Sequence, residues 1–357
     1  MKKRFLGVLL SVAMVAAVLA GCGSSGAKET AAPAGSETEA AGNTGDVITV
    51  GFSQVGAESD WRTANSESMK STFSTENGYN LIFDDAQQKQ ENQIAAIRNF
   101  IQQEVDYIVL APVTESGWDT VLQEAKDAEI PVIIVDRMVN VSDDSLYTAW
   151  VGSNFKLEGQ KACEWLKQYA AAKNMSEVNI VDIQGTIGAS AQIGRTEALN
   201  EAVKANGWNL LAQQTGEFTQ AKGQEVMESM LKQYDNINVV YCENDNEAFG
   251  AIEAIKAAGK TVGPDGDILV MSFDTTKQGI TDTLSGDIIV NTECNPLHGP
   301  RVEQIIKQLQ AGETPEKQAY VEEGIYAHGS DVASVSIDGT DYEVTEVTQD
   351  VVDARAY

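Results

Sequence analysis

Apolar residues along this chain fall into short runs that alternate with segments of helical pattern. The clearest run is Ile-Pro-Val-Ile-Ile-Val at positions 130–135, and it ends in Asp136 and Arg137. A run this continuous predicts a strand buried on both faces, as in a parallel sheet covered by helices. Ligands of such sheets bind beyond the carboxyl ends of the strands, so Asp136 and Arg137 are candidate ligand contacts. Taken alone, this strand leaves an ordinary surface turn equally open.

The same reasoning predicts strands along most of the chain. They cover positions 47–53, 80–84, 107–112, 132–136, 178–184, 239–242, 268–274 and 288–292. Apolar residues at helical spacing predict helices between them, most clearly over 90–103, 156–170 and 248–258. This alternation predicts an α/β fold with parallel sheets and helices on both faces, divided into two units near 149–154.

Polar side chains follow many of these predicted strands. If the carboxyl ends of two sheets face each other, such groups converge on a cleft between two domains. The alternative is that polar residues end strands because loops are solvated. That alternative accounts less well for the Asp, Asn and Arg side chains that accompany the aromatic residues Trp61 and Phe218.

The N-terminus carries an export pattern. Three basic residues, Lys2, Lys3 and Arg4, precede an apolar run over 5–20 and then Gly21 and Cys22. A basic segment, a short apolar segment and small residues predict a signal peptide over 1–21. Leu-Ala-Gly-Cys at 19–22 resembles the bacterial lipobox, which implies lipidation of Cys22; the alternative is an incidental cysteine. Residues 22–45 are rich in Gly, Ala, Ser, Thr and Glu, which predicts a flexible tether.

Composition narrows the possible functions. A net charge of −28 argues against nucleic-acid binding, which relies on clustered Lys and Arg. Beyond Cys22 the cysteines are Cys163, Cys242 and Cys294, an odd number that excludes a full disulfide framework. With two histidines and no metal-ligand spacing, we expect no metal and no cofactor. About 310 residues beyond the tether exceed one usual core, so two domains are expected.

Longer motifs resemble one known family. They are Gly-Phe-Ser-Gln-Val-Gly at 51–56, Gln-Gln-Lys-Gln-Glu-Asn-Gln at 87–93, Gln-Gly-Thr-Ile-Gly-Ala-Ser at 184–190 and Lys-Gly-Gln-Glu-Val-Met-Glu-Ser at 222–229. Together they resemble the galactofuranose-binding proteins of ABC importers, within the ribose- and galactose-type periplasmic sugar-binding family. The resemblance covers 47–310. It implies a type I periplasmic binding protein with two doubly wound lobes and a multi-strand hinge. The lobes would be 46–150 with 295–325, and 151–294 with 326–357.

The resemblance also implies a role for each ligand-binding residue. Charged and amide groups would bind hydroxyls, and aromatic rings would stack on the sugar. The residues that match these roles are Glu58, Trp61, Arg62, Asp136, Arg137, Arg195, Phe218, Asn244, Asp274 and Glu293. Three features depart from the family. Asp60 stands where a small residue is expected, Glu293 lies in an uncertain hinge alignment, and the tail 326–357 matches poorly. Within that tail, Asp338-Gly339 predicts a hairpin turn.

These observations lead to a functional hypothesis. We expect a lipid-anchored, extracytoplasmic solute-binding protein that closes on galactofuranose or a similar aldose and delivers it to an ABC permease. The expected partners are the sugar, the permease and the membrane through Cys22; we expect a monomer and no nucleic acid. One alternative is a sugar sensor that presents the bound form to a chemoreceptor or membrane kinase. A glycosidase is a further alternative, because paired carboxylates can hydrolyse sugars.

Overall fold

The computed structural model describes residues 47–357. Its first sheet has the strand order β11-β5-β4-β3-β1-β2, and every neighbouring pair is parallel. The strands are β1 (Ile48–Gln54), β2 (Tyr79–Asp85), β3 (Tyr107–Leu110), β4 (Val132–Val135), β5 (Ala149–Gly152) and β11 (Gln318–Tyr320).

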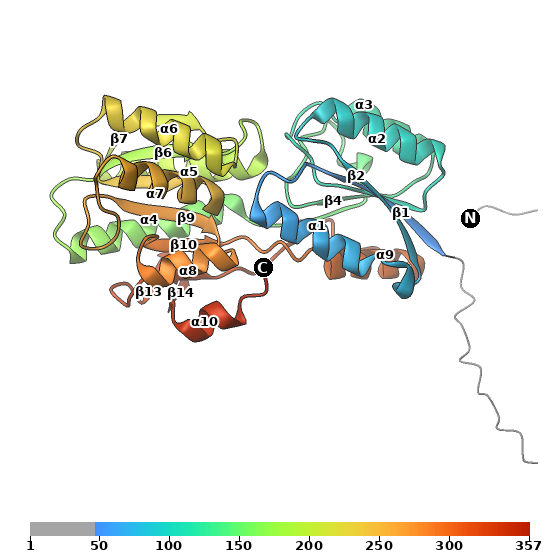
Figure 1. The fold of residues 1–357 in the computed structure, drawn as a ribbon. Coiled ribbons are helices and arrows are strands. Elements are labelled where there is room, and N and C mark those ends of the chain that lie inside the picture. Colours follow the sequence, from blue (N-terminus) through green and yellow to red (C-terminus); the bar gives the residue numbers. More distant parts are fainter. Residues whose placement is uncertain (1–46) are drawn as a thin grey trace, which may run out of the picture. The chain divides into compact units, whose positions relative to one another are not determined.

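Helices cover both faces of this first sheet (Figure 1). They are α1 (Asp60–Thr72), α2 (Gln90–Gln102), α3 (Asp119–Asp127) and α9 (Gly299–Gln310), with short 3-10 turns at Thr75–Asn77 and Asp144–Leu146. One core lies against α1 and α9 and the other against α2 and α3. Burial on both sides explains why β4 reads as an unbroken apolar run. We call this sheet and its helices the first lobe.

The second sheet has the order β13-β14-β12-β10-β9-β8-β6-β7. Its parallel part runs from β7 to β10, and β12 joins it antiparallel to β10. The strands are β6 (Asn179–Gln184), β7 (Asn209–Thr215), β8 (Val239–Cys242), β9 (Leu269–Asp274), β10 (Val290–Glu293), β12 (Ile325–Ala327), β13 (Ser334–Ile337) and β14 (Thr340–Glu346).

The helices of this second lobe pack as two pairs. α4 (Phe155–Ala172) contacts α5 (Ser190–Asn206), and α6 (Gln220–Gln233) contacts α7 (Asp245–Ala257). α8 (Lys277–Ser285) and α10 (Gln349–Ala354) pack together near β12. Separate apolar cores lie beneath the two pairs. The predicted α/β class, with helices on both faces of parallel sheets, is confirmed.

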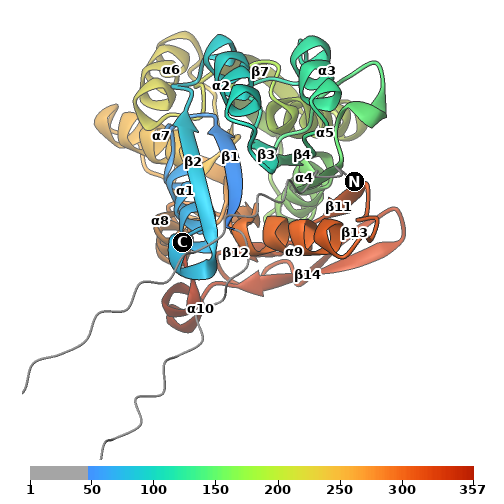
Figure 2. The same ribbon diagram turned by 90° about the vertical axis from the view of Figure 1, so that its right-hand side faces the viewer.

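Three chain segments connect the two lobes. They are residues 153–154 after β5, 294–298 after β10 and 321–324 after β11. Figures 1 and 2 show the second and third segments leading into α9 and out of β11. Because the chain crosses three times, each lobe combines residues that are far apart in the sequence.

The structure also differs from the sequence-based predictions in detail. Residues 149–152 were assigned to the break between units, but they form strand β5, and the chain crosses immediately after it. Strands β7, β11 and β12 were not predicted. The predicted hairpin is present, since β13 and β14 pair antiparallel with Ile337 opposite Thr340. Asp338 and Gly339 have φ angles of 51° and 82°, as a two-residue primed turn requires. Residues 1–46, with the predicted signal peptide, Cys22 and tether, lie outside the described part of the chain.

Candidate functional site

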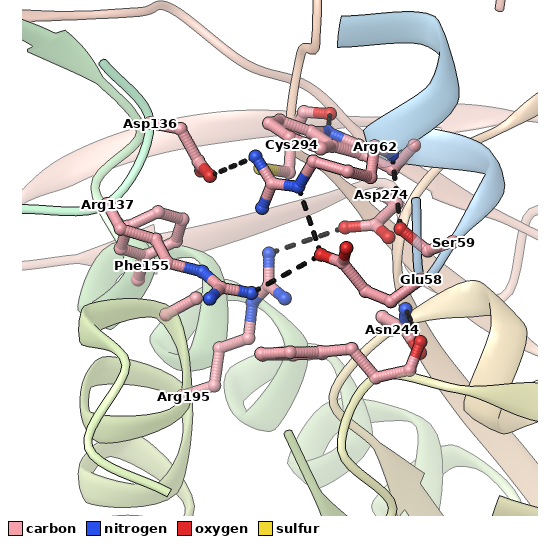
Figure 3. Close-up of a pocket in the computed structure, with 13 residues that line it drawn as sticks. Glu58, Ser59, Arg62, Asp136, Arg137, Phe155, Arg195, Asn244, Asp274 and Cys294 are labelled. Carbon is pink, nitrogen blue, oxygen red and sulfur yellow. Dashed lines mark hydrogen bonds and ion pairs between the residues drawn. The ribbon is translucent and has the colours of Figure 1, made fainter. Parts of the chain in front are cut away.

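A cavity lies where the carboxyl ends of strands from the two lobes meet (Figure 3). Side chains from both lobes line it, as in the clefts where small molecules bind between domains. The first lobe contributes Glu58, Ser59, Trp61, Arg62, Asp136 and Arg137, and the second contributes Phe155, Ala191, Arg195, Phe218, Asn244 and Asp274. Cys294, in the second connecting segment, completes the lining.

The start of helix α1 places four of these side chains. Ser59 is the N-cap residue, and its hydroxyl accepts a hydrogen bond from the backbone N–H of Arg62 at 3.1 Å. Glu58 and Arg62 are four residues apart, so one helical turn brings them together, with Nε 3.0 Å from Oε1. Between them Trp61 donates from its indole nitrogen to the carbonyl of Cys294 at 2.7 Å.

Charged groups of the first lobe form a connected network. Arg62 Nη1 lies 2.8 Å from Asp136 Oδ2, and Arg137 Nη2 lies 3.7 Å from Glu58 Oε1. A second nitrogen of Arg137 donates to the carbonyl of Val113 at 3.0 Å. All four charged side chains are at most 4% exposed. The other oxygen of Glu58, Oε2, is buried without a partner and can accept a ligand hydroxyl.

Burial and neighbouring charges set the ionisation of this network. Burial by itself would raise the pKa of Asp136, but the charges of Arg62 and Arg137 outweigh it and lower that pKa. Burial and the charge of Arg62 lower the pKa of Arg137 to about 10. Near neutral pH, Asp136 is therefore an anion and Arg137 a cation, so the pair offers an acceptor and a donor for hydroxyls.

The second lobe presents a similar arrangement. Arg195 lies on α5, and its Nη2 is 2.8 Å from Glu158 and 3.5 Å from Asp274. Burial raises the pKa of Asp274 well above its ordinary value, although Arg195 acts in the opposite direction. Asn244 caps α7 by accepting from the N–H of Glu247 at 2.8 Å, and its amide nitrogen donates to the carbonyl of Phe218 at 3.1 Å.

Aromatic rings form the apolar part of the lining. Trp61, Phe155 and Phe218 pack with Ala191 and Cys294 in one buried cluster. Phe218 belongs to the second lobe, yet its ring centre is 5.1 Å from the guanidinium carbon of Arg137 in the first lobe. Rings beside fixed charges suit a ligand with both C–H faces and hydroxyl edges.

Backbone conformation at the cavity is unusual for side-chain-bearing residues. Asp136, Phe218 and Asp274 have φ angles of 61°, 61° and 99°. Such left-handed conformations disfavour residues other than glycine and concentrate at functional sites. Three of them on one cavity indicate that the fold holds these side chains in place for a ligand.

All the predicted ligand-binding residues except Glu293 line the cavity. Glu293 is the last residue of β10 and directly precedes Cys294, which does line the cavity. Its carboxylate instead binds Arg355 at 2.7 Å, the hydroxyl of Tyr357 at 2.8 Å and the N–H of Gly324 at 2.9 Å. The expected sugar contact from Glu293 is therefore corrected to a contact with the C-terminal segment.

The sequence reasoning missed other lining residues. These are Ser59, Phe155, Ala191 and Cys294. Phe155 comes directly after the first chain crossing and Cys294 begins the second, and an isolated sequence does not mark these crossings. The helix-capping pattern Ser-Asp-Trp-Arg at 59–62 is the one signal that was available for Ser59. Asp60, singled out earlier, is exposed and absent from the lining; its N–H donates to Asn246 of the other lobe at 3.0 Å.

One group of side chains has the composition of a metal site. Glu158, Cys294 and Glu323 place ligand atoms within 4.8 Å of one another. Glu158 is already paired with Arg195, and Glu323 accepts from Ser153 at 2.6 Å and from the N–H of Asn295 at 2.7 Å. We therefore assign this group to hydrogen bonding among the connecting segments.

The fold and cavity define a class of protein. Two parallel-sheet lobes with a polar cavity at their strand ends and three connections are the architecture of a two-lobed solute-binding protein. The chain belongs to the periplasmic binding protein family, whose domain model matches residues 50–292. Membership of this family, with its type I fold, confirms the resemblance drawn from the sequence motifs.

Individual relatives agree with this assignment. The chain is 42% identical over 284 residues to the galactofuranose-binding protein YtfQ of Escherichia coli, covering 78% of this chain and 87% of that protein. A Mycobacterium smegmatis structure in complex with β-D-fucofuranose is 43% identical, with a TM-score of 0.75 over 78% of this chain and 91% of that one. The arabinose-transporter binding protein of a Shewanella species, bound to L-arabinofuranose, is 42% identical, with a TM-score of 0.73 over 78% and 92%. The first and third of these relatives are named as binding proteins, which agrees with the prediction that the chain is not an enzyme.

Within residues 47–357, no helix combines the length and the apolar character needed to cross a membrane.

Proposed function

We propose that this chain is the solute-binding component of an ABC importer and binds a monosaccharide in the furanose form, galactofuranose or a similar aldose. The observation that carries the proposal is the lining of the cavity. Carboxylates and guanidinium groups from both lobes surround a space flanked by aromatic rings. A sugar presents hydroxyls around its rim and C–H bonds on its faces, and this lining complements both.

The furanose form is supported by the names and titles of the relatives. Their names or bound ligands are galactofuranose, fucofuranose and arabinofuranose. The cavity lies between buried side chains of both lobes, so a bound ring would be contacted from both lobes. We therefore propose that ring form is a primary element of specificity.

Closure of the lobes is part of this proposal. Hydrogen bonds join the lobes beside the cavity, with Met138 N–H donating to Ser190 Oγ and Glu115 N–H to the Gly188 carbonyl, both at 2.9 Å. Such contacts form only when the lobes approach, and a ligand that touches both lobes favours the closed state. We propose that the permease receives the sugar from this closed form.

The membrane anchor completes the proposal. We infer that Cys22 is lipidated and that residues 22–45 tether the binding body to the outer face of the cell membrane, where it acts as a monomer. A Cys22→Ser variant expressed in the native host should leave the membrane fraction and enter the extracytoplasmic fluid. Retention of that variant in washed membranes would argue against lipidation.

Ring form can be tested with sugars that close only one ring. L-Arabinose without its terminal hydroxyl cannot form a pyranose, and L-arabinose without the hydroxyl on the preceding carbon cannot form a furanose. Isothermal titration should show binding of the first analogue and none of the second. Thermal shifts with D-galactose, D-fucose and D-ribose would rank the aldoses, because a ligand that binds only the native state raises its melting temperature. Equal binding of both analogues would contradict furanose selectivity.

A further inference from the structure

Phe218 occupies a backbone conformation that its side chain disfavours. It lies in the loop between β7 and α6, with φ at 61°, and the preceding Glu217 is left-handed as well, at 57°. The Phe218 ring lines the cavity and the residue is 4% exposed. An aromatic residue stays in this region only where its surroundings hold it there.

The start of helix α7 holds both backbone polar groups of Phe218. Its N–H donates to Glu247 Oε1 at 2.9 Å, and its carbonyl accepts from Asn244 Nδ2 at 3.1 Å. Asn244 lines the cavity itself, whereas Glu247 does not. Glu247 lies in the first turn of α7, and its carboxylate leaves that helix to reach a loop 29 residues earlier in the chain.

Glycines next to Glu247 and Phe218 leave room for the hydrogen bond between them. A Cβ on Gly216 would lie 2.6 Å from Glu247 Oε1, and a Cβ on Gly223 would lie 2.8 Å from the Glu247 Cα. On the other side of Phe218, a Cβ on Gly185 would overlap the ring. Glu247 itself is fully buried, and this burial raises its pKa. A buried acid is rarely retained without a partner, and its partner here is the N–H of Phe218.

We propose that Glu247 is a positioning residue for sugar binding, which acts through the backbone of Phe218 to set the plane of the aromatic ring against the ligand. This inference rests on the proposed sugar-binding function and adds a residue outside the cavity to it. The ring also lies against Arg137 of the first lobe. The Glu247 contact therefore places the ring for both the sugar and the opposing lobe.

The test is a double-mutant cycle between Glu247 and Phe218, measured by titration calorimetry with L-arabinose and D-galactose. Glu247→Ala removes the acceptor and leaves the Phe218 N–H unpaired. We expect it to weaken affinity roughly tenfold, the usual effect of one buried hydrogen bond. Glu247→Gln keeps a carbonyl acceptor of similar size and should restore most of the affinity. In a Phe218→Ala background, Glu247→Ala should add little further loss, because the ring it positions is gone.

The outcomes separate this inference from the function on which it rests. Wild-type protein that binds neither sugar overturns the sugar proposal and this inference together. Wild-type binding with an unchanged affinity in Glu247→Ala overturns the positioning role alone. An equal loss from Glu247→Ala with and without the Phe218 ring also overturns it, because the effect then does not pass through Phe218. Melting temperatures of all variants, measured without sugar, separate folding defects from binding defects.

Discussion

Arg195 and Glu158 form a buried ion pair in which two guanidinium nitrogens, Nε and Nη2, each lie 2.8 Å from the same carboxylate oxygen. Both side chains are 2% exposed. Arg195 lines the cavity and Glu158 stands behind it on α4. Glu158 therefore fixes the orientation of the arginine that the second lobe presents to the ligand, as supporting contacts of a binding group do.

Removal of Glu158 should affect both stability and binding. Glu158→Ala leaves Arg195 buried with Asp274, 3.5 Å away, as its remaining carboxylate neighbour. Breaking one side of a buried pair typically costs about 3–5 kcal/mol of unfolding free energy. We expect a loss of this order in urea unfolding and weaker sugar binding in calorimetry. Glu164→Ala on the same helix is the matched control, since its more exposed pair with Lys167 should contribute less than about 1 kcal/mol.

The Arg62–Asp136 pair gives a second prediction. Arg62→Ala and Asp136→Ala should each weaken sugar binding by more than about 2 kcal/mol, because each truncation leaves a buried charged partner. Calorimetry with L-arabinose measures the loss. The exposed pair Arg98–Glu124, with contacts of 2.8 Å, provides the control, and Arg98→Ala should leave affinity unchanged. Unchanged affinity in Asp136→Ala would remove this carboxylate from the site.

Sequence reasoning found most of the strands that are buried on both faces, because such strands consist largely of apolar residues. β4 is apolar throughout because helices cover both of its faces. β7 is Asn-Leu-Leu-Ala-Gln-Gln-Thr, lies at a sheet edge and is only half-buried, so it shows no apolar run. β5 is four residues long and directly precedes a crossing. Sequence reasoning therefore placed the boundary between the two units at this short apolar segment.

The cavity residues also divide into those that local sequence predicts and those that it does not. Asp136 directly follows buried strand β4 and Asp274 ends buried strand β9, so the rule for parallel sheets applies to each from local sequence. Phe155 reaches the cavity just after one crossing between the lobes and Cys294 at the start of another, so both depend on the tertiary path. Glu293 ends β10 and its carboxylate contacts Arg355 near the C-terminus, whereas the next residue, Cys294, lines the cavity.

Trp61 offers an optical test of the cavity. Its indole is 3% exposed, donates to the Cys294 carbonyl and lies 4.5 Å from the guanidinium carbon of Arg62. A sugar that contacts this ring changes its polar surroundings, so we expect intrinsic fluorescence to change on addition of L-arabinose or D-galactose. Trp61→Phe should abolish the response. Trp208→Phe is the control, because Trp208 packs against the core beneath α4 and α5, and it should preserve the response. A response that survives Trp61→Phe would contradict the assignment.

His298 should make stability depend on pH in the mildly acidic range. The ring is fully buried in the second connecting segment, where Nδ1 lies 3.0 Å from the amide nitrogen of Asn65 and the other nitrogen has no partner. Burial lowers its pKa from 6.5 to about 4. Between these values the unfolded chain binds a proton that the native state does not, so the native state loses stability as pH falls from about 6.5 to 4.

The difference between the pKa values of His298 in the unfolded and native states corresponds to a loss of unfolding free energy on the order of 3 kcal/mol. Buried carboxyl groups with raised pKa values, such as Asp245 at about 6, act in the opposite direction over part of the same range. The decisive quantity is therefore the difference in unfolding free energy between wild type and His298→Gln, measured by urea unfolding at several pH values. That difference should shift in favour of the variant as the pH falls, because glutamine takes up no proton. A difference that stays constant from pH 6.5 to 4 would show that His298 is not the group responsible.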